Sequence, residues 1–444
     1  MTATLDLSRF HQALDDLDTL RCSGRIVQVI GLTIEATGLS CQMGEVCEIR
    51  SAKTPEPIIA EVVGFRDDRV LLMPLGEMHG IAPGNEVVST GAGFSIVIGP
   101  QLIGRIVDGL GRPLDGKGPI SGRHYGVGNA PPNAMLRQRI EQPLATGVRA
   151  IDGLLTAGKG QRLGIFAGSG VGKSTLLGMI ARGVHADVNV IALIGERGRE
   201  VREFVERDLG PEGLKRSIVI VSTSDQPALV RVKGAWVATA IAEYFREQGL
   251  HISFLMDSVT RFAMAQREIG LTIGEPPAAK GYTPSVFAML PKLMERTGAS
   301  ENGTITGFYT VLVEGDDLQE PITDTVRSIL DGHIVLSREL AAENHYPAID
   351  VLGSVSRLMS QVADQGHKDA AALLREVLAT YANARDLVNI GAYVSGSNPA
   401  VDYALAAMAR VRDFLRQPPE ELVEFEETVA ALRGLFELPA TSNS

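Results

Sequence analysis

The sequence predicts a multi-domain α/β protein with an N-terminal small β-barrel, a central parallel-sheet domain and a C-terminal helical domain. Between residues 21 and 95, short Val- and Ile-rich segments are separated by Gly, Pro and Asp, which is typical of small all-β barrels. Within 96–365, apolar strands alternate with helical patterns, which favours a parallel sheet covered by helices on both faces. From 366 to 444 the apolar periodicity is helical.

Residues 1–20 precede the barrel and carry one apolar stripe. Leu7, Phe10, Leu14 and Leu17 recur at a spacing of three or four residues, so we expect a single amphipathic helix. Two interpretations of this stripe remain open at this point. It packs either on the chain's own domain or on a partner protein.

The expected barrel strands are short and end close to Gly, Pro or Asp. They cover residues 24–30, 32–36, 46–49, 58–63, 70–72 and 86–88. A further strand and a sharp Gly/Pro turn are expected in 102–115, and 126–133 is predicted to be a loop between domains.

The central domain is expected to contain buried strands joined by helices. The strands are predicted at 163–167, 190–194, 217–222, 252–256 and 307–313, and the helices at 173–184, 200–208 and 229–248. In the C-terminal domain, one helical face carries Leu374, Val377, Leu378 and Tyr381, and a second carries Met408, Val411, Phe414 and Leu415.

The composition excludes several classes of protein. With 45% apolar and 21% charged residues, the chain can bury a large core. Its net charge of −11 argues against nucleic acid as the main partner, because phosphate backbones select basic surfaces. The 3 cysteines lack metal-type spacing, so we expect reduced thiols. Because the sequence shows neither a secretion signal nor a membrane-spanning stretch, we expect a cytoplasmic protein.

The most informative stretch is RLGIFAGSGVGKST, residues 162–175. An apolar strand, a glycine-rich turn and a helix opening with Lys173 and Ser174 form the layout of a nucleotide phosphate-binding loop. The glycines let main-chain N–H groups approach phosphate oxygens, Lys173 can reach the β- and γ-phosphates, and Ser174 can place its hydroxyl on Mg²⁺. Ala167 stands where the generic pattern has Gly. The alternative is a Gly-rich turn without a ligand. The predicted nucleotide-binding residues of this loop are Gly168, Ser169, Gly170, Val171, Gly172, Lys173, Ser174 and Thr175.

Hydrolysis needs a metal-side carboxylate, a group that orients water, and positive charge for the transition state. Asp257 ends an apolar strand, where an open α/β sheet binds its ligands, and is predicted to hold Mg²⁺. Glu196 follows another strand and is the candidate for polarising the attacking water, with Arg197 beside it. The alternative for these two residues is a solvated charged turn.

Two residues far along the chain complete the candidate site. Arg357 follows a Gly/Ser turn and could reach the nucleotide of a neighbouring subunit, or form only a surface ion pair. Tyr346 precedes Pro347. Its ring could stack on adenine, or it could be an ordinary core tyrosine.

Together these segments resemble the hexameric ATPases of the rotary ATP synthase superfamily, and within it the type III protein export ATPases, particularly the flagellar branch. The resemblance extends over about residues 20–435. Its matching stretches are 104–115, 131–133, 146–152, 166–174, 195–201, 256–263, 281–287 and 313–317. It implies a RecA-like P-loop ATPase core, and Ala167 then agrees with the pattern of the export branch.

The resemblance also implies roles for individual residues. Lys173 matches the phosphate lysine and Ser174 the metal hydroxyl. Glu196 matches the catalytic glutamate, Arg197 the adjacent γ-phosphate arginine, and Asp257 the metal-side aspartate.

Two further matches concern the base and the subunit interface. Tyr346 matches a tyrosine that packs on adenine, and Arg357 matches an arginine presented across the subunit interface. Because one chain carries both Glu196 and Arg357, a ring of identical subunits, a homohexamer, could complete every site with Mg-ATP.

The resemblance implies several partners besides further copies of the chain. These are a dedicated regulator that binds residues 1–20, a stalk-like coiled-coil export protein, complexes of export substrates with their chaperones, and an export gate at the inner membrane. It thus implies a cytoplasmic enzyme at the periphery of the export apparatus, acting in substrate release and export entry.

The sequence also bears on four alternative functions. The region 390–399 is short and uncharged, which departs from the acidic loop of a synthase β subunit. A virulence injectisome ATPase is the nearest alternative. A Rho-like nucleic-acid motor fits the acidic composition poorly, and a non-catalytic ring subunit is expected to lack the catalytic carboxylate that Glu196 supplies.

Overall fold

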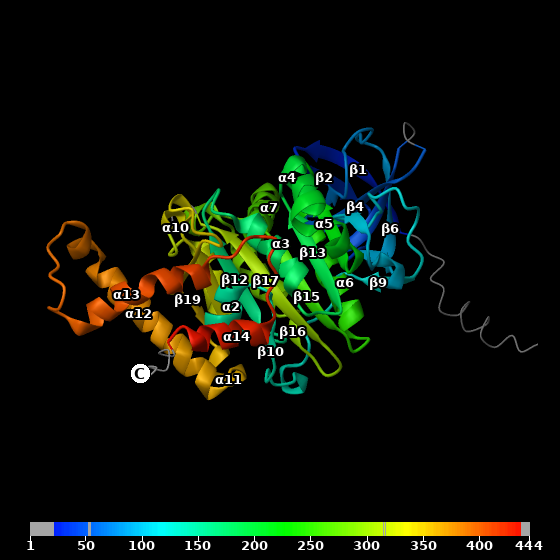
Figure 1. Cartoon of the computed structure of the whole chain (residues 1–444). Helices are drawn as coiled ribbons and strands as arrows, with labels where there is room; N and C mark the ends of the chain where they lie inside the picture. The colour runs from blue at the N-terminus through cyan, green and yellow to red at the C-terminus, as the bar shows by residue number, and fades with distance from the viewer. Residues whose placement is uncertain (1–21, 52–54, 314, 316, 437–444) are drawn as a thin grey trace, which may run out of the picture. The chain divides into compact units, whose positions relative to one another are not determined.

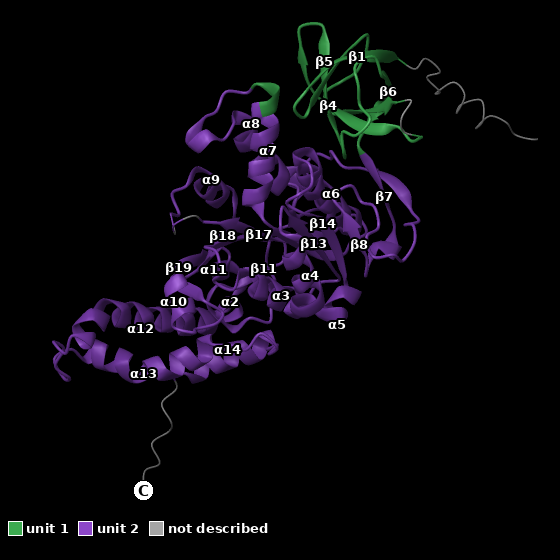
Figure 2. Cartoon of the chain, turned by 90° about the horizontal axis from the view of Figure 1, so that it is seen from above, with its two compact units in different colours: residues 1–94, 272–274 green, residues 95–271, 275–444 purple. Residues whose placement is uncertain are grey.

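The computed structural model describes residues 22–51, 55–313, 315 and 317–436. The helix expected at 1–20 lies outside these residues. The chain divides into two compact units, which Figure 2 colours separately: Met1–Phe94 with Thr272–Gly274, and Ser95–Leu271 with Glu275–Ser444. Among the described residues, no helix is long and apolar enough to cross a membrane.

The first unit contains the predicted barrel. Its strands are antiparallel and close in the order β1-β2-β5-β4-β3-β6. Alternate residues such as Ile34, Ile49, Leu72 and Val87 are fully buried in its core, as strand geometry dictates. The strands are β1 (Ser23–Ile30), β2 (Thr33–Thr37), β3 (Glu45–Arg50), β4 (Ile58–Arg66), β5 (Arg69–Pro74) and β6 (Glu86–Gly93).

The second unit is built on a sheet with the strand order β19-β18-β12-β17-β15-β13-β14-β8. Figure 1 labels its strands β19, β12, β17, β15 and β13. The predicted strands are mutually parallel, and the apolar run of β13 is buried throughout, as expected of a sheet covered on both faces. The strands are β8 (Ile106–Asp108), β12 (Arg162–Ala167), β13 (Val188–Ile194), β14 (Ser217–Ser222), β15 (His251–Asp257), β16 (Gly298–Ala299), β17 (Thr304–Leu312), β18 (Gly332–Leu336) and β19 (Ile349–Ser356).

The sheet differs from the prediction at its margins. Strands β18 and β19 were not expected from the pattern, and β19 runs antiparallel to β18, while β16 runs antiparallel to β17. An edge strand with one exposed side, such as β19, lacks the continuous apolar run that marks a central parallel strand. Two small ribbons accompany the sheet: β7 (Ser95–Ile98) with β9 (Arg123–Gly126), and β10 (Pro143–Leu144) with β11 (Ala157–Gly158).

Helices connect these strands. The helix predicted over 200–208 is confirmed, and within it α4 continues into a π-helical stretch, Phe204–Leu209. Its Glu and Arg residues give a helical charge pattern that does not distinguish the two helix types. The helices of the core are α2 (Arg149–Leu154), α3 (Lys173–Gly183), α4 (Gly198–Glu203), α5 (Gly210–Lys215), α6 (Ala228–Arg246), α7 (Val259–Ile273), α8 (Pro284–Met294), α9 (Pro321–Ile329) and α10 (Arg338–Ala342), with short 3-10 turns at Pro100–Leu102, Ala134–Leu136 and Ala279–Gly281.

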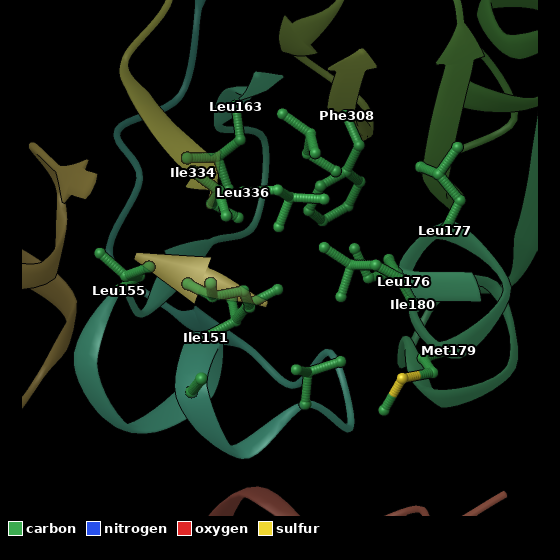
Figure 3. Packing of buried hydrophobic residues seen from close by; sticks show 14 of the residues in the cluster. Ile151, Leu155, Leu163, Leu176, Leu177, Met179, Ile180, Phe308, Ile334 and Leu336 are labelled. Carbon is green, nitrogen blue, oxygen red and sulfur yellow. The ribbon is translucent and has the colours of Figure 1, made fainter. Parts of the chain in front are cut away.

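The C-terminal helical domain is confirmed. It contains α11 (Met359–Val362), α12 (Gln365–Asn389), α13 (Pro399–Leu415) and α14 (Phe425–Gly434). The side chains of Asp364 and Asn398 cap α12 and α13 by accepting hydrogen bonds from main-chain N–H groups. Leu374 and Val377 of α12 and Phe414 of α13 belong to the same buried cluster as the sheet residues shown in Figure 3, so this domain shares a core with the central α/β domain.

A buried ion pair fixes the connection before α2 against the core. Arg296 donates to both carboxylate oxygens of Glu243, at 2.8 and 2.5 Å, and to the carbonyl of Val127 at 2.8 Å. Asn129 donates to Glu243 at 2.9 Å, and the guanidinium lies 5.3 Å from the ring centre of Trp236. Arg296 and Glu243 are 0% and 1% exposed, so each charge depends on the other for compensation.

Candidate functional site

The glycine-rich turn lies between β12 and α3, at the carboxyl edge of the parallel strands. Gly170 and Gly172 adopt φ values of 80° and 89°, a left-handed region that favours glycine. Gly172 also permits a close approach, because a methyl group there would lie 3.4 Å from the ring of Tyr346. The main-chain N–H groups at the start of α3 have no helical acceptors, which makes this turn an anion-binding site.

A cleft of about 670 Å³ opens over this turn. The sequence-predicted residues that line it are Gly168, Ser169, Gly170, Gly172, Lys173, Ser174, Thr175, Glu196 and Arg197. Val171 is buried below the turn and does not line the cleft. Asp257, Tyr346 and Arg357 are also outside its lining.

Lys173 is the electrostatic centre of the site. Its ammonium forms an ion pair with Asp257 Oδ1 and lies 3.6 Å from Glu196 Oε1. Burial by itself lowers the pKa of Lys173, but the two carboxylates outweigh it and raise the pKa above its usual value. The lysine therefore stays charged. Asp257 Oδ1 also accepts a 2.8 Å hydrogen bond from Thr310 on β17, which fixes the carboxylate at the end of β15.

Glu196 follows β13 and borders the cleft. Burial, and then the negative charge of Asp257, raise its pKa to about 7, against the opposing effect of Lys173. Its Oε1 atom is buried and accepts no hydrogen bond from the described residues. A carboxylate whose pKa lies near neutral pH, on a residue that lines the cleft, is suited to act as a general base.

The oxygen atoms near Lys173 also suit a hydrated magnesium ion. The described residues contain no group of three or more His, Cys, Asp or Glu side chains able to enclose a metal. Mg²⁺ is commonly held by one or two protein oxygens together with water and substrate phosphates. The Ser174 hydroxyl on the cleft and the Asp257 carboxylate beside Lys173 are hard oxygen ligands of this kind.

The arginines are placed differently from one another. Arg197 is at the rim, with its side chain 77% exposed and 3.4 Å from Glu200. Arg357 is exposed just after β19, and its main-chain N–H donates to Asp331 O at 3.1 Å. The structure therefore does not bring Arg357 to the cleft of its own chain.

Two cleft arginines had no assigned role in the sequence analysis. Arg261 and Arg338 both line the cleft, and Arg261 packs so closely on Gly195 that a methyl group there would lie 2.7 Å from its Cβ. Arg261 stands in the stretch 256–263 that carries the family resemblance. Its position in the first turn of α7, directly after the strand that ends in Asp257, is the signal that could have identified it.

Comparisons with known proteins identify the family of the chain. Residues 147–356 match the model of the ATP synthase alpha/beta family, nucleotide-binding domain, and residues 26–91 match the beta-barrel domain of that family. Residues 363–434 match the T3SS EscN ATPase C-terminal domain.

Individual relatives cover nearly the whole chain. A protein named flagellum-specific ATP synthase from Bacillus subtilis is 56% identical over 425 residues, which is 94% of this chain and 96% of the relative. A type 3 secretion system ATPase from Xanthomonas euvesicatoria is 52% identical, covering 93% of each chain. The solved structure of the assembled ATPase EscN from enteropathogenic E. coli has a TM-score of 0.88 at 47% identity, covering 93% of this chain and 99% of that one.

Proposed function

The chain belongs to the ATP synthase alpha/beta family and is an ATP hydrolase, and from this premise we propose that it energises flagellar type III protein export as a homohexameric ring. The observation that carries the proposal is the grouping of Lys173, Asp257 and Glu196 at one edge of the sheet, beside a turn able to hold phosphates. A ring is supported by the likeness to an EscN structure described as assembled.

In the proposed reaction, main-chain N–H groups of residues 168–175 hold the phosphates of ATP, and Lys173 supports the β- and γ-phosphates. Ser174 and Asp257 would hold Mg²⁺, which when bound neutralises charge on the phosphate oxygens. Glu196 orients and deprotonates the attacking water. Tyr346, 39% exposed and adjacent to Gly172, packs on the adenine ring.

Positive charge for the transition state comes from several sources. Arg261 and Arg197 are on the cleft of the same chain, whereas Arg357 is exposed elsewhere on it. We assign Arg357 to the site of the neighbouring copy, where an arginine supplied across an interface accelerates phosphoryl transfer by about 10³–10⁵-fold.

The proposed partners follow from the relatives. One EscN structure is described as a complex with its central stalk EscO, so we propose that a comparable coiled-coil protein enters the ring. The remaining proposed partners are a regulator bound through residues 1–20, chaperone–substrate complexes, and the export gate, with the ring in the cytoplasm against the inner membrane.

The test has a biochemical and a cellular arm. The purified chain is expected to release phosphate from ATP only with Mg²⁺ present, and its gene to restore secretion of flagellar subunits in a strain that lacks its own flagellar ATPase. Secretion of injectisome substrates without flagellar subunits would favour the alternative of a virulence ATPase, which the Xanthomonas relative supports. Absence of ATP hydrolysis would refute the proposal.

A further inference from the structure

The connection between α13 and α14, residues 416–424, is attached to the nucleotide-binding core by several hydrogen bonds. Arg149 donates to Phe414 O at 3.0 Å and to Arg416 O at 2.5 Å, and its guanidinium lies 2.6 Å from Glu421. Arg182 near the end of α3 donates to Pro419 O at 2.5 Å. This connection thus contacts the helix that begins at the phosphate-binding turn.

Gln417 is at the centre of this attachment and is only 2% exposed. Its Oε1 accepts from the Arg149 N–H at 2.8 Å. Its Nε2 donates to Gly147 O and to Glu421 O, both at 2.8 Å. The amide therefore joins the segment before α2 to the C-terminal domain, and burial makes loss of these partners costly.

The main chain of the same residue reaches the tyrosine beside the phosphate-binding turn. The Gln417 N–H donates to Tyr346 O at 2.9 Å. The Tyr346 ring lies against Gly172, within 3.4 Å of where a methyl group there would be. The hydrogen bonds of its buried side-chain amide hold Gln417 in place. The main-chain hydrogen bond from Gln417 in turn restrains the position of Tyr346.

We propose that Gln417 is a positioning residue for the base-binding side of the nucleotide site, holding Tyr346 beside the phosphate-binding turn without touching the nucleotide. The proposal rests on the proposed function, in which Tyr346 contacts adenine. It follows that the C-terminal helical domain determines how firmly the base is held, while the turn at 168–175 grips the phosphates independently.

The test compares Mg-ATP with Mg-tripolyphosphate, which has the three phosphates but no base. Gln417→Met keeps the size of the side chain and removes its hydrogen bonds. We expect its dissociation constant for Mg-ATP to rise roughly 3- to 10-fold, the range an aromatic contact supplies. The dissociation constant for Mg-tripolyphosphate should stay the same. Arg433→Met, which removes the exposed Arg433–Asp364 ion pair of the same domain, is the matched control and should change neither value.

A double substitution isolates the role of the tyrosine. In a Tyr346→Ala background, Gln417→Met is expected to have no further effect on ATP affinity, because the contact it positions is gone. Equal weakening of ATP and tripolyphosphate binding would show a general structural role and overturn the proposal, as would unchanged affinity for both. If the wild-type chain bound neither ligand, the proposed function itself would fail, whereas normal wild-type binding with an unaffected Gln417→Met variant would refute only the positioning role.

Discussion

Lys173 Nζ lies 3.6 Å from Glu196 Oε1, so the residue proposed to hold the phosphates is in electrostatic contact with the residue proposed to activate water. Removing either one changes the charge seen by the other. Glu196→Gln is the mildest such change, because it keeps the shape of the side chain and removes only its charge.

We expect Glu196→Gln to lower the ATPase rate by about 10²–10⁴-fold, the usual contribution of a general base, while Mg-ATP binding persists. Phosphate release and calorimetry measure the two properties separately. Glu203→Gln, at a half-exposed residue paired with Arg199 at 2.8 Å, is the control and should remain active. A Glu196→Gln variant with full activity would contradict the assigned role.

The raised pKa of Glu196 predicts how the rate depends on pH. Burial and Asp257 bring this pKa to about 7, and the side chain can accept a proton only when it is ionised. The ratio kcat/KM, which reports the chain before it binds ATP, should therefore be constant above this pKa and fall about tenfold per pH unit below it. A kcat/KM that stays constant down to about two pH units below 7 would exclude Glu196 as the base.

Mixing two inactive variants tests whether neighbouring copies complete one site. Arg357→Ala alone should lower the ATPase rate by about 10³–10⁵-fold. When it is mixed in equal amounts with Glu196→Gln and allowed to assemble, about a quarter of interfaces should combine an intact Glu196 with an intact Arg357. The measured rate should recover accordingly. A mixture no more active than its components would place Arg357 outside the catalytic site.

The buried ion pair of Arg296 and Glu243 predicts an effect on stability. Glu243→Ala leaves the Arg296 charge without compensation in the core and should destabilise the fold by about 3–5 kcal/mol. Glu212→Ala, whose side chain is 81% exposed, should change stability by less than about 0.5 kcal/mol. Thermal unfolding measures both, and equal melting temperatures would contradict the prediction.

The spacing of apolar residues predicted most of the fold, because this spacing depends on which side chains of a single strand or helix are buried. The barrel strands and the central parallel strands have alternating or continuous apolar runs, and the structure places them where the pattern does. Strands β18 and β19 were not expected because their apolar runs are short or interrupted. The place of β8 in the sheet depends on pairing with β14, which is distant in sequence. The π-helical stretch at Phe204–Leu209 has no distinct sequence signal.

Part of the candidate site could also be predicted from the sequence. The residues of the turn and Glu196 are attached to strands of one sheet, whose carboxyl ends meet at one edge, so their order along the chain indicates that they lie together. Arg357 follows β19 at the sheet margin, and no property of a single chain reveals which surface it meets in a ring. Gln417 was missed because its role comes from contacts that span 268 and 270 residues of sequence.

The barrel of the first unit closes on itself, with β6 paired to both β1 and β3. A closed barrel leaves no strand edge with unsatisfied main-chain donors and acceptors. Copies of the chain cannot join there by extending a sheet, which is the route that leads to uncontrolled aggregation. Any association through this unit must use side-chain surfaces. Substitution of single surface residues can then change the strength of that association without disturbing the strands beneath.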